Sequence, residues 1–121
     1  MVIPIDNRMT VNGVALGRRL FYDPILSVNN TISCASCHHL PNGFGDTLKF
    51  SKGVNGSQGT INALSLVNVG WYNRFFWDGR AHTLEEQALE PIQNPIEMHE
   101  NLQNVVGKIQ NHQDYPALFR A

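Results

Sequence analysis

The sequence has no long hydrophobic run and no marked excess of either charge. Its 121 residues include nine Lys and Arg against ten Asp and Glu, so the formal net charge is −1. A membrane-spanning helix needs roughly 20 consecutive apolar residues, and a nucleic-acid-binding domain usually carries a clear basic excess. The sequence therefore predicts no membrane span and no nucleic-acid partner. Its first six residues also lack the charged and apolar regions of an export signal.

Cysteine is scarce too, and both cysteines belong to one motif, which reads CASCH over residues 34–38. A structural zinc site needs about four ligands, and a thioredoxin-like pair would lie near a strand and helix crossover. Neither pattern accompanies this motif. Its spacing is that of covalent c-type haem attachment, in which two thiols form thioethers and the histidine binds the iron. We predict that Cys34, Cys37 and His38 hold one haem c, and a non-haem redox or metal pair is the weakest alternative.

Short helices are predicted in the N-terminal half, and no strand pattern is strong. Apolar residues recur at helical spacing over residues 14–21, and this helix should end near Pro24, because proline restricts the residue before it. The attachment motif should begin a helix of its own near Ser33. Residues 41–59 contain five glycines and few large side chains, so this stretch is predicted to be a loop that wraps a cofactor.

Two further helices are predicted in the C-terminal half. Thr83 and Glu86 have the spacing of a capping box, in which each side chain binds the backbone of the other residue. This helix should run to about residue 90 and stop at Pro91. Residues 100–110 carry one apolar face and should form the next helix. The fold class is therefore all-α, with short helices and long glycine-rich loops, in one domain over residues 1–121.

The sixth ligand of the iron decides between electron transfer and chemistry. Met98 follows His38 by sixty residues, which is close to the separation of the ligands in small electron carriers with histidine and methionine on the iron. A lone methionine is nevertheless more often a core residue than a ligand. A carrier with His38 and Met98 on the iron thus remains the alternative. The other residues with a ligating atom are Met9, His39, His82, His99 and His112.

Seven motifs follow one another along the chain. They read LGRRLFYDP (16–24), SCASCH (33–38), GFGD (43–46), INA (61–63), FWDGR (76–80), LEEQA (84–88) and PIQNPIEM (91–98). This ordered set, which covers roughly residues 14 to 119, resembles the N-terminal haem domain of the bacterial di-haem cytochrome c peroxidases and MauG-type enzymes. The resemblance implies a cytochrome c-like haem domain. It also implies that this haem is the peroxidatic one of two.

The resemblance assigns a role to five further residues. Glu97 matches the distal acid and base that acts on peroxide, and Gln87 and Pro91 match residues of the same distal pocket. Trp77 matches the tryptophan that conducts electrons between the two haems. Asn62 matches a residue that helps to hold a calcium ion between the haem domains.

The chemistry of these residue types agrees with the assignment. Cleavage of peroxide requires that a proton move from one oxygen to the other, and a carboxylate can carry it. Glu97 can therefore do what Met98 cannot. Without the ordered motifs, Glu97 would be read as a solvated surface acid, Trp77 as core and Gln87 as part of an exposed helix face.

The sequence departs from the family in two respects. Many members carry a histidine that blocks the peroxidatic iron, and the corresponding position here is Val54, in a stretch from residue 43 to residue 70 without histidine or methionine. We therefore expect an open iron. The chain also has only one attachment motif, and residues 115–120 read as the opening of a helix, so we expect the N-terminal half of a longer two-haem enzyme.

Such an enzyme implies a location and a set of partners. Haem is attached to these motifs outside the bacterial cytoplasm, so the expected location is the periplasm. The expected partners are hydrogen peroxide, an electron-donor cytochrome or cupredoxin, and the second haem domain.

Overall fold

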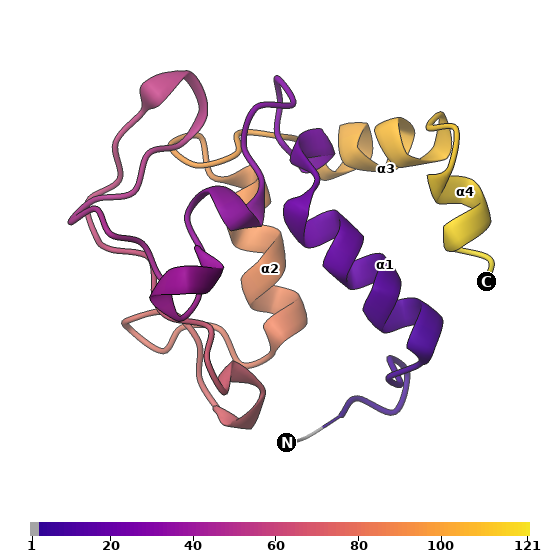
Figure 1. The fold of residues 1–121 in the computed structure, drawn as a ribbon, viewed down its shortest axis with the longest axis horizontal. Helices are drawn as coiled ribbons and strands as arrows, with labels where there is room; N and C mark the ends of the chain where they lie inside the picture. Colours follow the sequence, from indigo (N-terminus) through magenta and orange to yellow (C-terminus); the bar gives the residue numbers. More distant parts are fainter. Residues whose placement is uncertain (1–2) are drawn as a thin grey trace.

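The computed structural model describes residues 3–121 and is helical, with no β-strand in that range. This confirms the all-α prediction. Four α-helices are connected by loops that contain single 3-10 turns (Figure 1). The α-helices are α1 (Val11–Tyr22), α2 (Leu84–Gln93), α3 (Leu102–Gln110) and α4 (Tyr115–Leu118). The 3-10 turns are η1 (Pro24–Leu26), η2 (Cys34–Ser36), η3 (Leu40–Asn42), η4 (Val54–Gly56) and η5 (Val69–Trp71).

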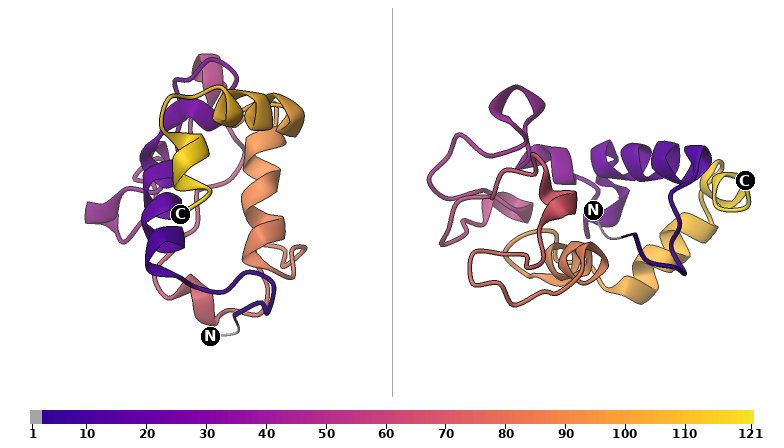
Figure 2. Two further views of the ribbon diagram at one scale, coloured as in Figure 1. Left: turned by 90° about the vertical axis from the view of Figure 1, so that its right-hand side faces the viewer. Right: turned by 90° about the horizontal axis from the view of Figure 1, so that it is seen from below.

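The helices and the loops occupy different parts of the molecule. The loops between η2 and α2 lie on the left of Figure 1, and α1, α3 and α4 lie on the right. Both views of Figure 2 place α1 and α2 on opposite sides of the helical part, with α3 crossing at one end. In residues 3–121 no helix is long and apolar enough to cross a membrane.

Helix α1 begins earlier than predicted and ends where predicted. The Thr10 hydroxyl accepts a hydrogen bond from the Gly13 N–H at 2.9 Å and caps the first turn. Asp23 ends the helix in extended conformation directly before Pro24. Helix α1 contacts η1 and η2, so it lies against the turn that carries the cysteines.

Helix α2 differs from the prediction at both ends. The Thr83 hydroxyl accepts from the Glu86 N–H as expected, but the Glu86 carboxylate accepts from the N–H of His82 rather than from that of Thr83. The helix also continues past Pro91 to Gln93. Pro91 removes only the single hydrogen bond that its own N–H would have donated, and the end comes instead at Asn94, which precedes Pro95.

The other predicted helices are found with shifted bounds. The expected helix near Ser33 is only the single turn η2. Helix α3 begins at Leu102, where the Asn101 side chain caps it by accepting from the N–H of Gln103. The predicted helix opening at residues 115–120 is present as the short helix α4.

Lys108 links α3 to the segment after η1, and its charge belongs to a partly buried ion pair. Glu100 and Lys108 form the pair, and Nζ of Lys108 also donates to the carbonyl oxygen of Ser27 at 2.6 Å. Burial disfavours the charged Glu100 carboxylate, but the hydrogen bonds from Lys108 and neighbouring amides outweigh it and lower its pKa. The polar groups in this contact are therefore paired, as buried charges must be.

The buried apolar core is small for a chain of this size. Its accessible surface is 8188 Å², whereas a folded monomer of 13.6 kDa is expected to expose about 6,600 Å². The buried apolar residues among residues 3–121 are Val54, Phe75, Ala81, Ile92, Met98 and Tyr115. Much apolar surface is thus available to a large apolar group or to a second domain.

Candidate functional site

The two cysteines lie three residues apart on and after turn η2, half-buried and not joined in a disulfide. Burial raises the pKa of both thiols, and for Cys37 the nearby carboxylates of Asp46 and Glu97 raise it further. Both thiols are therefore uncharged at neutral pH. Reactive and metal-binding cysteines need the thiolate, so this environment disfavours a redox or zinc pair and suits conversion to neutral thioethers.

The imidazole of His38 is fixed by a backbone group. Its Nδ1 lies 2.9 Å from the carbonyl oxygen of Phe44. A carbonyl can only accept, so Nδ1 carries the proton and Nε2 keeps a free lone pair. This is the usual arrangement of a metal-binding histidine, whose other ring nitrogen is held by a carboxylate or a carbonyl.

The loop after His38 is folded to present that carbonyl. The backbone is left-handed at Gly43 (φ 62°) and also at Phe44 (φ 56°), which is unusual for an aromatic residue. The N–H of Phe44 donates to the carbonyl oxygen of His39 at 2.9 Å, and this closes the loop. The Phe21 ring of α1 packs edge-on against the Phe44 ring, with 5.9 Å between the centroids. The role of Phe44 was not predicted from the sequence, although the motif GFGD was the available signal.

Glu97 stands on a tight turn that follows α2. Its N–H donates to the carbonyl oxygen of Asn94 at 3.0 Å, and Pro95 occupies the second position of this turn, where its fixed φ is favourable. Pro95 has no N–H, so the carbonyl of Pro91 lacks its helical partner and accepts instead from the N–H of Met98 at 3.2 Å. The segment after α2 therefore folds back along the helix end.

A second loop supports Glu97 from the other side. The N–H of Val54 donates to the Glu97 carbonyl oxygen at 2.8 Å. A Cβ added at Gly53 would lie 1.9 Å from the carbonyl oxygen of Ile96, so only glycine fits there. Val54 is buried, with 1% of its surface exposed, and Asn55 and Gly56 after it both have positive φ, as in a type I′ turn.

The carboxyl group of Glu97 is exposed at the surface yet crowded by neighbouring groups. Desolvation raises its pKa, and Glu90 adds to this, while a hydrogen bond from Asn94 and the charge of Arg80 act in the opposite direction. A carboxyl whose pKa is raised can accept and release a proton closer to neutral pH.

Met98 is the neighbour of Glu97 but has the opposite environment. Only 3% of its surface is exposed, and its carbonyl accepts from the N–H of Val28 at 3.0 Å. Its side chain is part of the buried apolar core, where a lone methionine is usually found. With so little of its surface exposed, the thioether has no open side for an iron, and this argues against Met98 as a ligand.

The structure brings two of the other predicted site residues together. The indole N–H of Trp77 donates to the carbonyl oxygen of Asn62 at 2.9 Å, and 64% of Trp77 is exposed. The Asn62 side chain donates to the carbonyl oxygens of Asp46 and Leu48. Its side-chain oxygen is therefore the atom that could reach a cation. Among residues 3–121 no cluster of three or more His, Cys, Asp or Glu side chains could hold a metal ion, and the calcium role of Asn62 stays a prediction.

Gln87 and Pro91 lie one helical turn apart on α2, and both are half-buried. Because Pro91 has no N–H, the Gln87 carbonyl lacks the hydrogen bond that it would otherwise receive within the helix. This part of α2 therefore offers a polar backbone atom without a helical partner, one turn before the Pro91 carbonyl that binds the Met98 N–H.

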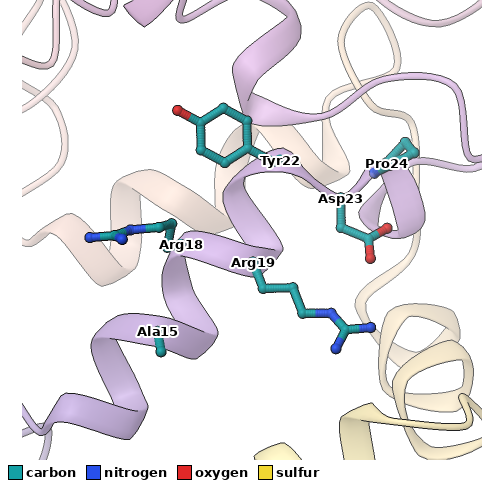
Figure 3. A pocket seen from close by; sticks show the side chains of 6 residues that line it. All are labelled: Ala15, Arg18, Arg19, Tyr22, Asp23 and Pro24. Carbon is teal, nitrogen blue, oxygen red and sulfur yellow. The ribbon is translucent and has the colours of Figure 1, made fainter.

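One cavity lies away from these residues. An open hollow of about 580 Å³ is lined by six residues of α1 and η1 (Figure 3): Ala15, Arg18, Arg19, Tyr22, Asp23 and Pro24. None of the predicted site residues lines it. Arg19 in this hollow is already paired with Asp114 at 2.6 Å, so this cavity is not the candidate site.

The residues of the candidate site fit a haem group. Two uncharged thiols follow the attachment spacing, Nε2 of His38 is free to bind iron, and the described chain exposes many large apolar side chains. A haem buries its apolar faces while its iron takes an axial histidine. The fold and the site thus define a helical haem-binding domain of the cytochrome class.

The chain belongs to the di-haem cytochrome c peroxidase family, whose model matches residues 11–121. It is 48% identical over 99 residues to the cytochrome c peroxidase Ccp of Escherichia coli. The matched region covers 80% of this chain and 21% of that protein. It is 38% identical over 117 residues to the methylamine utilization protein MauG of Methylorubrum extorquens. This second matched region covers 97% of this chain and 33% of that protein.

A solved structure has the same fold. A MauG-like protein associated with microbial copper homeostasis superimposes with a TM-score of 0.88 and 38% identity, over 97% of this chain and 35% of that one. The chain therefore spans between about a fifth and about a third of the length of these relatives.

Proposed function

We propose that this chain is the peroxide-reducing haem domain of a larger di-haem enzyme, with haem c attached through Cys34 and Cys37 and His38 as the proximal ligand. The observation that carries the proposal is the pairing of Glu97 and Met98. The carboxyl is presented at the surface with a raised pKa, while the thioether beside it is buried in the core. A peroxidase needs the first group, and a carrier would need the second.

The haem, when bound, supplies the iron and the redox chemistry that the side chains lack. Glu97 accepts a proton from one oxygen of hydrogen peroxide and returns it to the other, so that the departing oxygen leaves as water. Reduction to two water molecules consumes two electrons and two further protons. Gln87 and Pro91 complete the distal side of the pocket.

The electrons come from outside this chain. Trp77 is exposed and held by its hydrogen bond to Asn62, so it can lie against a second haem domain and conduct electrons from it. We propose that a periplasmic donor, a cytochrome or a cupredoxin, reduces that second domain. A calcium ion between the domains would use Asn62 and ligands of the second domain.

The test is a pair of adjacent substitutions in the full-length holoprotein. Glu97→Gln should leave the ferric spectrum and cyanide binding nearly unchanged, because no ligand to the iron is removed. It should slow peroxide cleavage by roughly 100-fold, since the proton carrier is lost. Stopped-flow spectroscopy measures the cleavage rate.

Met98→Leu is the control, because leucine keeps the volume in the core but cannot bind iron. It should leave both the spectrum and the rate nearly unchanged. Ferric protein should also bind cyanide before any reduction, since no histidine or methionine occurs between residues 43 and 70. A silent Glu97→Gln together with a Met98→Leu that opens a six-coordinate iron would establish the electron carrier instead.

A further inference from the structure

Asn94 is engaged through all of its polar groups in the segment that carries Glu97. Its N–H donates to the Glu90 carbonyl at 2.9 Å and closes α2. Its carbonyl accepts from the N–H groups of Glu97 at 3.0 Å and of His99 at 2.9 Å. Its side-chain Oδ1 accepts from the N–H of Ile96 at 3.0 Å, and its Nδ2 donates to Oε1 of Glu97 at 2.8 Å.

The oxygen and the nitrogen of the Asn94 side-chain amide bind different partners. The bond from the Ile96 N–H to Oδ1 is an Asx turn, which shapes the backbone at Pro95. The bond from Nδ2 reaches only the carboxyl of Glu97. The orientation of the amide follows from its partners, because an N–H needs an acceptor and a carboxylate needs a donor.

This contact makes the two oxygens of Glu97 unequal. Oε1 accepts a hydrogen bond from a neutral donor that cannot itself take up a proton at neutral pH. A proton on the carboxyl is therefore placed on Oε2, since protonation of Oε1 would compete with the bond from Nδ2. The rest of the support for Glu97 is backbone, through the N–H of Val54 and the turn at Asn94.

We propose that Asn94 is the positioning residue of Glu97: its Nδ2 holds Oε1, and Oε2 is the oxygen that exchanges the proton with peroxide. The inference rests on the proposed function of Glu97 and adds the residue that orients it. Two other charged groups act on the same carboxyl, Arg80 and Glu90. Both act over a longer range, and neither donates a hydrogen bond to it in the described structure.

The decisive variant is Asn94→Asp in the full-length holoprotein. Aspartate keeps the acceptor for the Ile96 N–H, so the turn is retained, but it removes the donor to Glu97 and adds a negative charge. We expect an unchanged ferric spectrum and a peroxide cleavage rate lower by about 10- to 100-fold, the scale of a misplaced catalytic group. The pKa of Glu97 should rise, because a like charge disfavours the carboxylate.

Two readouts separate positioning from a merely structural effect. Infrared difference spectroscopy should show the Glu97 carboxyl titrating at higher pH in Asn94→Asp than in the natural protein. In a Glu97→Gln background, Asn94→Asp should cause no further loss of rate, because it acts through Glu97. An equal loss in both backgrounds would overturn the proposal.

Asn101→Asp is the matched control. Asn101 also accepts from a backbone N–H two residues ahead, at 2.7 Å, but it caps α3 instead of facing Glu97. Its substitution should leave the cleavage rate and the Glu97 titration unchanged. If Glu97→Gln is silent, the proposed function itself fails. If Glu97→Gln is impaired while Asn94→Asp matches the natural protein, only the role of Asn94 fails.

Discussion

The hydrogen bond between His38 and the Phe44 carbonyl links the attachment motif to the loop after it. The acceptor is a backbone atom, so its position depends on the left-handed backbone of Gly43 and Phe44 rather than on a side chain. The chemistry of the cysteines depends on a similar detail, since burial keeps both thiols uncharged. Both details suit the proposed covalent attachment of a haem.

The proposed covalent attachment gives a prediction for these residues. Intact-mass measurement under denaturing conditions should show one haem added to the holoprotein, and none in a variant with Cys34→Ala and Cys37→Ala together. The single variant Cys37→Ala should keep one thioether and shift the pyridine haemochrome band. Ser36→Ala, within the same turn, should retain the full added mass. Haem that dissociates from the unsubstituted protein on denaturation would contradict the prediction.

At the level of the elements, the loop at Gly53 and the turn after α2 form one support for Glu97. A Cβ at Gly53 would lie 2.5 Å from the Glu97 carbonyl oxygen and 2.7 Å from its Cα. Both contacts are with backbone, which cannot rotate away as a side chain could. The two segments must therefore separate if any larger residue replaces Gly53.

Gly53→Ala should consequently destabilise the holoprotein by about 1–3 kcal/mol, the usual cost of overpacking. It should also lower the peroxide cleavage rate, because Glu97 is displaced. Denaturant unfolding and stopped-flow spectroscopy measure the two effects. Gly107→Ala is the control: nothing lies within 4 Å of the added Cβ on α3, and alanine favours a helix by roughly 1 kcal/mol. Equal stability of the two variants would show that the close approach is not present in solution.

The sequence predicted the helical segments because their apolar spacing and caps are local signals. It failed at Pro91, where a proline inside a helix costs one hydrogen bond but does not force an end. It failed at Glu86 as well, whose carboxylate reached one residue further back than the capping rule states. The roles of Phe44 and Asn94 depend on turn geometry and on single hydrogen bonds within their segments, which no periodicity reports.

At the scale of the whole molecule, the chain exposes more surface than its mass predicts. The excess over a typical monomer is about 1,600 Å² (8188 Å² against about 6,600 Å²). Large aromatic residues contribute to it, among them Trp71 (68% exposed) and Trp77 (64% exposed). The proposed haem and second domain would cover part of this surface.

The haem-free chain should therefore be largely unfolded. Binding of haem to the folded state alone stabilises it by mass action, and the remaining apolar core is small. Circular dichroism of the haem-free double cysteine variant should show little helix at 25 °C and no cooperative thermal transition. A midpoint close to that of the holoprotein would contradict this expectation.

Glu97 and Met98 are consecutive residues, and their backbone directs one side chain outward and the other into the core. The hydrogen bond from the Met98 N–H to the Pro91 carbonyl fixes how many residues separate this pair from α2. Deleting one residue between Pro91 and Glu97 would move Met98 into the exposed position that Glu97 now occupies. Inserting one residue there would move the Glu97 carboxyl into the buried position of Met98. The presentation of a carboxyl at this surface, on which the proposed function depends, is therefore set by the number of residues between α2 and the turn.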